Sequence, residues 1–147
     1  MNVLVTGANG QLGNEMRLMA QNSSHHYIFT DVEELDITDF NAILQTVKEK
    51  EIQIIVNCAA YTNVDKAEND FDTANALNNI AVGRLANVAK AQNATLIHIS
   101  TDYVFNGNNH IPYTEDDITD PIGVYGKTKL AGEETIKKVG CNYIILR

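Results

Sequence analysis

The 147-residue sequence predicts an α/β fold built on a doubly wound parallel sheet, with helices on both faces and three layers in all. Three observations predict it. Short apolar runs rich in β-branched residues recur along the chain, segments with helical periodicity separate them, and a glycine turn directly follows the first run. Strands that alternate with helices in this way are typical of parallel sheets joined by right-handed crossovers.

The first apolar run and its glycine turn predict a strand followed by a phosphate-binding loop. Asn2 to Thr6 suits a buried parallel strand, and the next glycines fall at G-x-x-G-x-x-G spacing. Gly7 permits the tight turn, Gly10 lets a diphosphate approach the backbone, and Gly13 lets the next helix pack close to the sheet. Free N–H groups at that helix N-terminus favour a phosphate. The alternative is a turn that binds nothing, and the strand and helix around the motif weigh against it.

An acidic residue at the end of the second strand fits the same motif. Tyr27 to Thr30 is predicted as a strand that Asp31 closes, about 20 residues after the glycine turn. The Asp31 carboxylate can accept hydrogen bonds from both hydroxyls of an adenosine ribose, and it repels a 2′-phosphate. Because no arginine stands nearby, NADH is favoured over NADPH. The alternative is an acid in a surface turn, but turn and acid together predict a Rossmann fold with a dinucleotide site.

The remaining elements follow from hydrophobic periodicity, caps and turn residues. Helices are predicted at Gly10–Asn22, Phe40–Lys50, Thr73–Gln92 and Gly123–Val139, and further strands at Ile52–Asn57, Thr95–Ser100 and Asn142–Leu146. Thr38 or Asp39 is the expected N-cap of the second helix, and Asn63 to Asp72 is an acidic, polar stretch. The segment from Asn106 to Gly123 holds both prolines and is predicted as a loop. Loops of that length in compact domains are usually functional or disordered.

Other residues at the same edge of the sheet could contact a dinucleotide. Asp36 could bond the adenine amino group, and Ile37 could touch the ring, if the sheet is doubly wound. Ala59 and Ala60 follow the third strand, where small residues let a cofactor lie close. The alternative for these alanines is that they only fill the core.

A tyrosine and a lysine four residues apart predict the reactive site. Tyr125 and Lys129 share one helix face, and the lysine ammonium favours the phenolate, so Tyr125 could pass a proton to a developing alkoxide. Thr101 closes the fourth strand, where its hydroxyl could hold a substrate carbonyl oxygen, and Lys129 could also hold the nicotinamide ribose. This arrangement suits hydride transfer to a ketone. The alternative for the pair alone is an exposed aromatic–cation contact.

Charge and composition exclude several classes of function. The formal net charge is −8 without any basic cluster, so nucleic acid and anionic membranes are unsuitable partners. We expect no secretory leader, and no apolar run approaches the ~20 residues of a membrane span. Cys58 and Cys141 lie in apolar runs and are predicted to be buried thiols, which fits the reducing cytoplasm. No Cys/His cluster has metal-ligand spacing and His25-His26 suits a solvated loop, so no metal site is predicted.

Three longer strings carry a resemblance to a known family. CAAYTNVDKAE at 58–68, STDYVFNG at 100–107 and VYGKTKLAGE at 124–133, with the glycine turn, resemble the extended branch of the short-chain dehydrogenase/reductase superfamily, and within it the family of dTDP-4-dehydrorhamnose reductases. The resemblance covers essentially the whole chain. It implies an enzyme that uses NADH or NADPH to reduce the 4-keto group of dTDP-4-dehydro-L-rhamnose to dTDP-L-rhamnose, a sugar donor for bacterial surface polysaccharide.

The resemblance also implies residue roles. Thr101, Tyr125 and Lys129 would be catalytic, and Asp102 and Tyr103 would face the substrate sugar together with Thr101. Asn78, rather than the adjacent Asn79, would support the site through backbone contact. The implied cofactor residues are Gly7, Gly10, Gln11, Leu12, Gly13, Asp31, Asp36, Ile37, Ala59, Ala60, Tyr61, Asn78, Tyr125 and Lys129.

The resemblance further bears on how much of a protein this chain represents. Family members run to nearly twice this length, so we expect residues 1–147 to be an N-terminal fragment that forms the NAD(P)-binding domain, without the C-terminal substrate domain. Such a chain should bind a dinucleotide weakly and turn over little or nothing alone. Homodimers, in some members with Mg²⁺, are implied as well.

Two other functions stay open at this stage. A regulatory subunit of methionine adenosyltransferase resembles the same reductases and binds nucleotide without catalysing a reaction. An epimerase or dehydratase acting on another nucleotide sugar would also use Tyr125 and Lys129. Dehydratases usually add acidic partners beside the threonine, a place that Asp102 occupies here.

Overall fold

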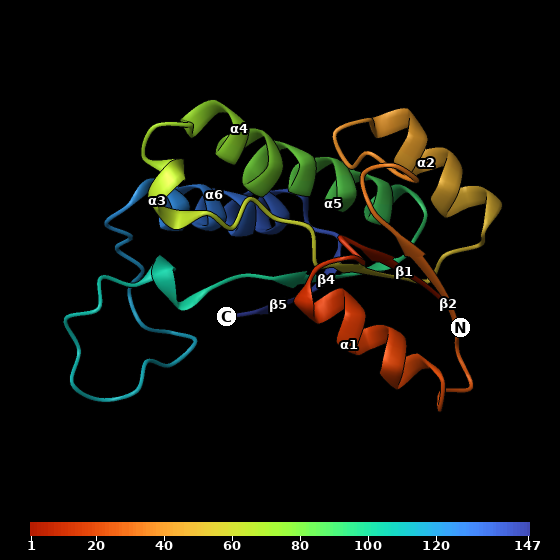
Figure 1. The fold of residues 1–147 in the computed structure, drawn as a ribbon, viewed down its shortest axis with the longest axis horizontal. Coiled ribbons are helices and arrows are strands. Elements are labelled where there is room, and N and C mark those ends of the chain that lie inside the picture. Colours follow the sequence, from red (N-terminus) through yellow and green to blue (C-terminus); the bar gives the residue numbers. More distant parts are fainter.

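The computed structural model describes residues 1–147 and contains one five-stranded sheet between helices (Figure 1). The strands, all parallel and in the order β2-β1-β3-β4-β5, are β1 (Asn2–Thr6), β2 (His26–Thr30), β3 (Ile54–Asn57), β4 (Thr95–Ile99) and β5 (Asn142–Leu146). The chain steps outward from β1 to β2 and then to β3 on the other side of β1. This reversal makes the carboxyl ends of β1 and β3 the switch point at which such sheets bind ligands.

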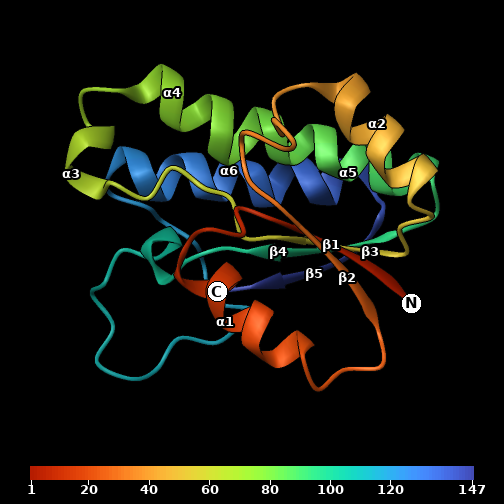
Figure 2. The same cartoon turned by 45° about the vertical axis from the view of Figure 1, so that its right-hand side comes forward.

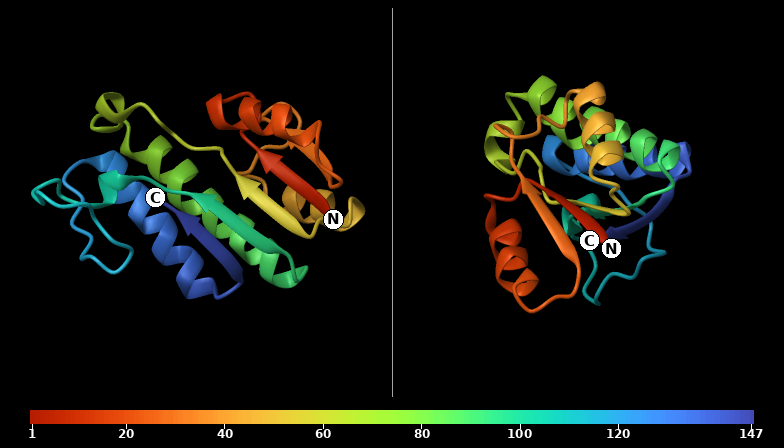
Figure 3. Two further views of the ribbon diagram at one scale, coloured as in Figure 1. Left: turned by 90° about the horizontal axis from the view of Figure 1, so that it is seen from below. Right: turned by 90° about the vertical axis from the view of Figure 1, so that its right-hand side faces the viewer.

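Helices cover both faces of the sheet, so the predicted α/β class with a doubly wound parallel sheet is confirmed. One face carries α2 (Phe40–Glu49), α5 (Ala81–Ala91) and α6 (Val124–Val139), with the short α3 (Val64–Ala67) and α4 (Phe71–Asn75) at one end of that layer. The opposite face carries α1 (Gln11–Ala20) and the segment 106–123 (Figure 2). Figure 3 shows that the strands point the same way, which gathers their carboxyl ends at one edge.

Helix α2 shows how local sequence produces these elements. The Asp39 side chain is its N-cap and accepts hydrogen bonds from the N–H groups of Asn41 at 2.9 Å and Ala42 at 3.1 Å. Ile43 and Val47 are one turn apart and fully buried, because positions i and i+4 share the face that meets the sheet. Asp39, and not the alternative Thr38, is therefore the N-cap of the helix.

The helix predicted over 73–92 is confirmed, because the chain is helical without a break from Phe71 to Ala91, but the sequence did not predict the irregular turn within it. The chain is helical in α3 and α4, passes through a π-helical turn at Ala76–Ile80, and then continues as α5. The polar stretch 63–72 is thus partly helical, with the Asn63 side chain capping α3 through the Lys66 N–H at 2.9 Å. Periodicity missed the turn because one extra residue in a helix displaces the apolar stripe without ending it.

Two rows of side chains run across the face of the sheet that meets α2, α5 and α6. Leu4, Ile55 and Leu96 lie side by side in the register of β1, β3 and β4 and belong to a core cluster of 17 buried apolar residues. Two positions further on, at the carboxyl edge, the row is polar. It consists of Thr6, Asn57 and His98, where the Thr6 hydroxyl donates to Asn57 Oδ1 at 2.7 Å and Asn57 Nδ2 donates to His98 Nδ1 at 3.1 Å.

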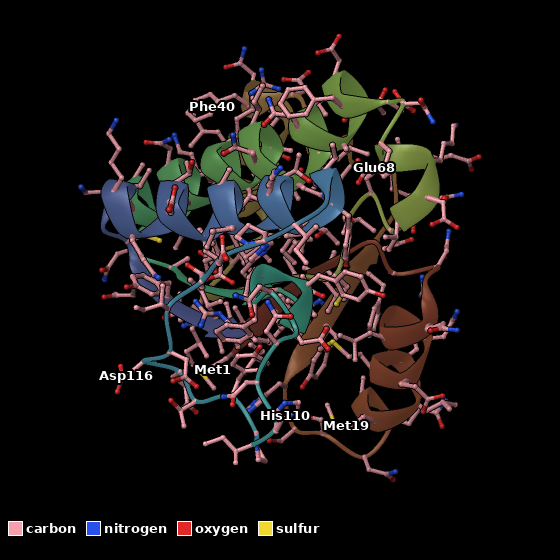
Figure 4. All side chains as sticks on the ribbon, turned by 90° about the vertical axis from the view of Figure 1, so that its left-hand side faces the viewer. Met1, Met19, Phe40, Glu68, His110 and Asp116 are labelled. Atoms are coloured by element: carbon pink, nitrogen blue, oxygen red, sulfur yellow. The ribbon has the colours of Figure 1, made fainter.

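The segment 106–123 contains no helix or strand, as its prolines and glycines predicted. It projects from the end of the sheet, and Figure 4 shows His110 and Asp116 on the side of this loop that lies away from the sheet. The Tyr113 ring stacks on Phe105 with centroids 4.3 Å apart, which fastens the middle of the segment to the body of the protein. None of the helices has the length and apolar composition that crossing a membrane requires.

Candidate dinucleotide site

Two glycines shape the turn between β1 and α1. Gly7 adopts φ of 63°, where other residues are strained, and a Cβ there would come within 2.6 Å of the Ala59 backbone. At Gly13 a Cβ would come within 2.5 Å of the Ala8 Cα, so only glycine lets α1 pack this close to the loop. A hydrogen bond from the Gly10 N–H to the Gly7 carbonyl at 3.2 Å closes the turn.

A cavity of about 920 Å³ opens between this turn and the segments that follow β2 and β3. Its walls include ten residues predicted to bind a cofactor, namely Gly7, Gly10, Gln11, Leu12, Gly13, Asp31, Asp36, Ile37, Ala59 and Ala60. A Cβ on Gly10 would meet nothing nearer than the Gly7 carbonyl oxygen at 3.3 Å, so the glycine leaves open space above the backbone. The other predicted cofactor residues, Tyr61, Asn78, Tyr125 and Lys129, do not line this cavity.

Asp31 stands at the cavity wall, where both of its carboxylate oxygens hold backbone N–H groups. Oδ2 accepts from Asn9 at 2.9 Å, and Oδ1 accepts from Val32 at 2.9 Å. The Asp31 N–H itself donates to Glu34 Oε2 at 2.8 Å. Each carboxylate oxygen has a second lone pair, so the fixed carboxylate can still accept hydrogen bonds from ligand hydroxyls.

The expectation that no arginine lies near Asp31 is wrong. The Arg17 guanidinium lies over the Phe29 ring at 4.7 Å, and its Nη2 donates to Asn9 Oδ1 at 3.4 Å. Asn9 thus bonds Arg17 through its side chain and Asp31 through its N–H, so this one residue links the cation to the carboxylate. The arginine was overlooked because α1 packs back beside β2, which brings its second turn to the end of that strand.

Asp36 and Ile37 lie between β2 and α2 and line the cavity. Each side chain also makes a second contact, Asp36 with Thr38 and Ile37 with the core. Asp36 Oδ1 accepts the Thr38 hydroxyl at 2.7 Å and the Thr38 N–H at 2.8 Å, and these bonds lower the pKa of the Asp36 carboxyl. Ile37 packs in the main core and is 5% exposed, so only its edge can meet a ligand.

The two cysteines differ in burial, although both were predicted to be buried. Cys141 is buried, whereas Cys58 is only partly covered and lines the cavity after β3. Burial of the thiol still raises the pKa of Cys58 to about 11, and its sulfur lies 3.9 Å from that of Met16. Cys58 therefore stays a neutral thiol at the cavity wall.

The three predicted catalytic residues come from the end of β4 and from α6. Thr101 Oγ1 accepts the Tyr103 N–H at 3.2 Å and donates to Asp102 Oδ1 at 3.2 Å. Tyr125, in the first turn of α6, meets the Tyr103 ring edge-on with centroids 5.6 Å apart. This approach requires Gly126, because a Cβ there would collide with the Tyr103 carbonyl oxygen. The short helical turn Asp102–Val104 thus seats the end of β4 on α6.

Lys129 is more deeply buried than a cofactor-binding lysine was expected to be. Its side chain is 1% exposed, and its Nζ donates to the Ile99 carbonyl at 2.5 Å. Burial lowers the pKa of the Lys129 ammonium to about 8, and the nearby Glu133 carboxylate opposes this shift. The hydrogen bonds of Lys129 include none to the Tyr125 hydroxyl, so the predicted ribose and phenolate contacts need a rearranged side chain.

Asn78 occupies the π-helical turn, a feature that is frequent at functional sites. It is 1% exposed and hydrogen-bonds both the N–H and the carbonyl of Tyr61, while its Nδ2 also reaches the Thr128 hydroxyl at 3.2 Å. Gly132 lets α6 come close, since a Cβ there would collide with the Asn78 carbonyl oxygen. Asn78 therefore ties the segment after β3 to the helix that carries Tyr125.

Sequence reasoning missed seven residues that shape the site. Glu68, which lies beside the N-terminal end of α6 in Figure 4, accepts the Val124 N–H with Oε1 at 2.8 Å and so caps the helix of Tyr125. Asn9 could have been found, because it lies inside the glycine motif. The other five wall residues each adjoin a residue that was predicted, but sequence spacing does not show which neighbouring side chains reach the cavity. The missed residues of the cavity wall are Asn9, Val32, Leu35, Cys58, Thr62 and Leu77.

The fold and the cavity at its switch point define a Rossmann-type α/β protein with a ligand site beside the glycine turn. The chain belongs to the family described as the RmlD substrate binding domain, whose model matches residues 1–147. The resemblance to dTDP-4-dehydrorhamnose reductases that the sequence carries is confirmed by relatives with that name.

Three such relatives show how far the similarity extends. The dTDP-4-dehydrorhamnose reductase of Mycolicibacterium smegmatis is 42% identical over 135 residues, which are 91% of this chain and 41% of that protein. A crystal structure of a dTDP-4-dehydrorhamnose reductase from Clostridium acetobutylicum is 43% identical with a TM-score of 0.95, covering 99% of this chain and 52% of that one. The Bacillus anthracis enzyme in complex with NADP is 39% identical with a TM-score of 0.94, covering 98% and 51%. The chain thus spans about half the length of these relatives.

A protein with another name is similar to a comparable degree. The methionine adenosyltransferase 2 subunit beta of Pongo abelii is 40% identical over 152 residues, covering 99% of this chain and 45% of that protein. Similarity alone therefore does not decide between a reductase and a protein with this other role.

Proposed function

We propose that the protein carrying this chain reduces the 4-keto group of dTDP-4-dehydro-L-rhamnose with a nicotinamide cofactor, and that residues 1–147 are its cofactor-binding domain. The observation that carries the proposal is the glycine-turn cavity with Asp31 at its wall, in a fold whose α6 holds Tyr125 and Lys129. Relatives named dTDP-4-dehydrorhamnose reductase at about 40% identity support the same reaction.

The residues at the glycine turn fit a dinucleotide. No side chain caps the N-terminus of α1, so the first N–H groups of the helix, with its dipole, can bind a diphosphate above Gly10. Asp31 accepts the adenosine ribose hydroxyls, and Asp36 and Ile37 lie where the adenine would rest. When bound, the reduced nicotinamide supplies the hydride that a carbonyl carbon accepts.

The side chains of β4 and α6 supply the proton and the orientation. The Tyr125 hydroxyl gives its proton to the C4 oxygen of the sugar as C4 gains the hydride, so the ketone becomes a secondary alcohol. The Thr101 hydroxyl holds the same oxygen, and Asp102 and Tyr103 face the sugar. Once its side chain turns away from the Ile99 carbonyl, Lys129 stabilises the negative charge left on the Tyr125 oxygen and holds the nicotinamide ribose.

Between the two nicotinamide cofactors we favour NADH. A 2′-phosphate would approach the Asp31 carboxylate, and like charges repel. Arg17 is the cation that could offset this repulsion, but its guanidinium already rests on Phe29 and bonds Asn9. The preference is therefore a balance between Asp31 and Arg17.

The test adds NADH and dTDP-4-dehydrorhamnose to the intact gene product that carries residues 1–147 and identifies the product. Tyr125→Phe is the matched variant, because it removes only the proton donor. We expect formation of dTDP-L-rhamnose by the unmodified protein, a fall in kcat of about 10²- to 10⁴-fold in the variant, and unchanged NADH binding. Equal rates for the two proteins would refute the catalytic assignment.

A non-catalytic nucleotide-binding subunit is the second candidate, favoured by the 40% identity to the methionine adenosyltransferase subunit of Pongo abelii. In the same assay such a protein binds the cofactor and forms no product, with or without Tyr125. An epimerase or dehydratase is recognised by its different product.

The resemblance adds three proposals about the intact protein. It forms a homodimer, Mg²⁺ supports that dimer, and the protein works in the cytoplasm. Light scattering of the intact protein, before and after EDTA treatment, measures whether two copies pair and whether a divalent cation is needed.

A further inference from the structure

A carboxylate that no predicted role uses lies fully buried on α6. Glu133 has no exposed surface and follows Lys129 by four residues, just as Lys129 follows Tyr125. Residues spaced by four share one side of a helix, so all three project from the same side of α6. Burying a carboxylate costs several kcal/mol unless partners compensate, so its contacts need an explanation.

Glu133 has partners from two strands. Ser100, directly after β4, donates from its hydroxyl to Oε1 at 2.5 Å. Arg147, directly after β5, donates from Nε to Oε1 at 3.1 Å and from Nη2 to Oε2 at 2.7 Å. Lys137 adds an ion pair at 3.9 Å on the solvent side, where its side chain is 49% exposed. The carboxylate is thus satisfied mainly by the ends of β4 and β5.

These partners belong to the strand ends that carry the candidate chemistry. The Ser100 N–H donates to the Leu146 carbonyl at 2.6 Å, which joins the two strand ends to each other, and Ser100 is the residue before Thr101. Lys129 holds the Ile99 carbonyl from the same helix. Consecutive residues at the end of β4 are therefore held by consecutive turns of α6, Ile99 by Lys129 and Ser100 by Glu133.

Stability alone does not require an ionic arrangement here. Replacing a buried ion pair by apolar residues of similar volume is often neutral or stabilising. What the charged arrangement adds is geometry, because a carboxylate with two oxygens can hold a hydroxyl and a guanidinium in fixed directions. The gain is a defined register between the end of β4 and α6.

We propose that Glu133 is a positioning residue that, through Ser100 and Arg147, fixes Thr101 at the end of β4 against Tyr125 and Lys129 on α6. The inference rests on the proposed function, because only a reductase needs Thr101 aligned with Tyr125 and Lys129 for catalysis. The alignment of the end of β4 with α6 can still be measured separately from activity. Glu133 also places a negative charge one turn from Lys129, which keeps the ammonium of that buried lysine charged to higher pH.

Three variants of the intact gene product that carries residues 1–147 separate the roles. Glu133→Gln keeps the size and an acceptor but removes the charge, and Ser100→Ala removes only the link to β4. Lys137→Met is the matched control, because it removes the exposed partner of the same carboxylate. NMR measures the NOE between the Tyr103 and Tyr125 rings, which reports the seating of the β4 end on α6, and the titration of the Lys129 side chain.

The control should keep the ring NOE and the Lys129 titration of the unmodified chain. Glu133→Gln and Ser100→Ala should weaken the NOE while the amide spectrum stays that of a folded chain, and Glu133→Gln should also lower the pKa of Lys129. In the intact protein, Ser100→Ala should reduce kcat about tenfold without changing KM for NADH. An unchanged NOE in folded Glu133→Gln would overturn the proposal, whatever happens to the Lys129 titration, because loss of the charge alone is enough to change that titration. Absence of any turnover by the unmodified intact protein would instead refute the proposed function, and the NMR result would stand.

Discussion

Asn78 pairs with both polar groups of the Tyr61 backbone. Its Oδ1 accepts the Tyr61 N–H at 2.8 Å, and its Nδ2 donates to the Tyr61 carbonyl at 3.1 Å. Tyr61 directly follows Ala59 and Ala60 of the cavity wall, and Asn78 lies on the π-helical turn. One buried amide therefore holds the exit of β3 against the helical layer.

Removing this amide should destabilise the chain more than removing its neighbour. We expect Asn78→Ala to lower the free energy of unfolding by about 3 kcal/mol, since three hydrogen bonds of a buried side chain are lost at about 1 kcal/mol each. Asn79→Ala is the control and should cost about 1 kcal/mol, because Asn79 is partly exposed and bonds only the side chains of Asn75 and Thr135. Urea unfolding measures both, and equal losses would contradict the role of Asn78.

The glycines of the turn should separate ligand binding from stability. Gly13→Ala places a methyl group against the Ala8 backbone, so α1 must shift, and both stability and NADH binding should fall. Gly10→Ala meets only the Gly7 carbonyl oxygen at 3.3 Å, so stability should change little, while the methyl group occupies the place of the diphosphate. We expect at least a tenfold rise in Kd for NADH in Gly10→Ala with nearly unchanged Tm. Unchanged NADH affinity would show that the ligand lies elsewhere.

Cofactor preference should respond in opposite directions at Asp31 and Arg17. Asp31→Ala removes the acceptor of the ribose hydroxyls and the charge that repels a 2′-phosphate, so NADH binding should weaken and NADPH binding should improve. Arg17→Met keeps the packing on Phe29 but removes the cation, so NADPH binding should weaken more than NADH binding. Fluorescence titration gives the ratio of the two Kd values. A ratio that neither variant changes would remove both residues from the ribose site.

The buried imidazole of His98 predicts an acid-sensitive fold. Burial, with the charge of Lys129 as a smaller cause, lowers the pKa of His98 to about 3. Between that value and about 6.5 the unfolded chain binds the extra proton and the folded chain does not, so stability is complete above pH 6.5 and falls as the pH drops toward 3. The slope from this single group is at most about 1.4 kcal/mol per pH unit.

Urea unfolding at pH 7, 5.5 and 4.5 tests this dependence. His98→Leu should flatten the loss of stability on acidification, since leucine does not titrate. The exposed His26 provides the control, and His26→Gln should follow the unmodified chain. Identical pH profiles for His98→Leu and the unmodified chain would contradict the assigned burial of a neutral imidazole.

Local signals in the sequence were sufficient for the fold and for the cavity beside the glycine turn. Gly7, Gly10 and Gly13 constrain the backbone by their own chemistry, and Asp31 follows a strand that pairs with β1, so spacing along the chain translates directly into position. Strand and helix types were correct for the same reason. The predicted roles of Thr101, Tyr125 and Lys129 stay predictions until activity is measured.

Features that depend on packing between distant segments could not be predicted in the same way. The π-helical turn forms where Asn78 reaches Tyr61, a contact over 17 residues that periodicity does not contain. Arg17 meets Asn9 only because α1 folds back beside β2. The burial of Lys129 and Glu133 depends on how α6 meets the ends of β4 and β5.

The central claim is that a dinucleotide binds where the first strand turns into the first helix. A titration of the ¹⁵N-labelled 147-residue chain with NADH, followed by amide chemical shifts, tests it most directly. The account predicts saturable shifts confined to the loop from Gly7 to Gly13, to Asp31 and to the residues after β3. Saturating NADH that leaves these amides unmoved, or that moves a separate surface instead, would contradict it.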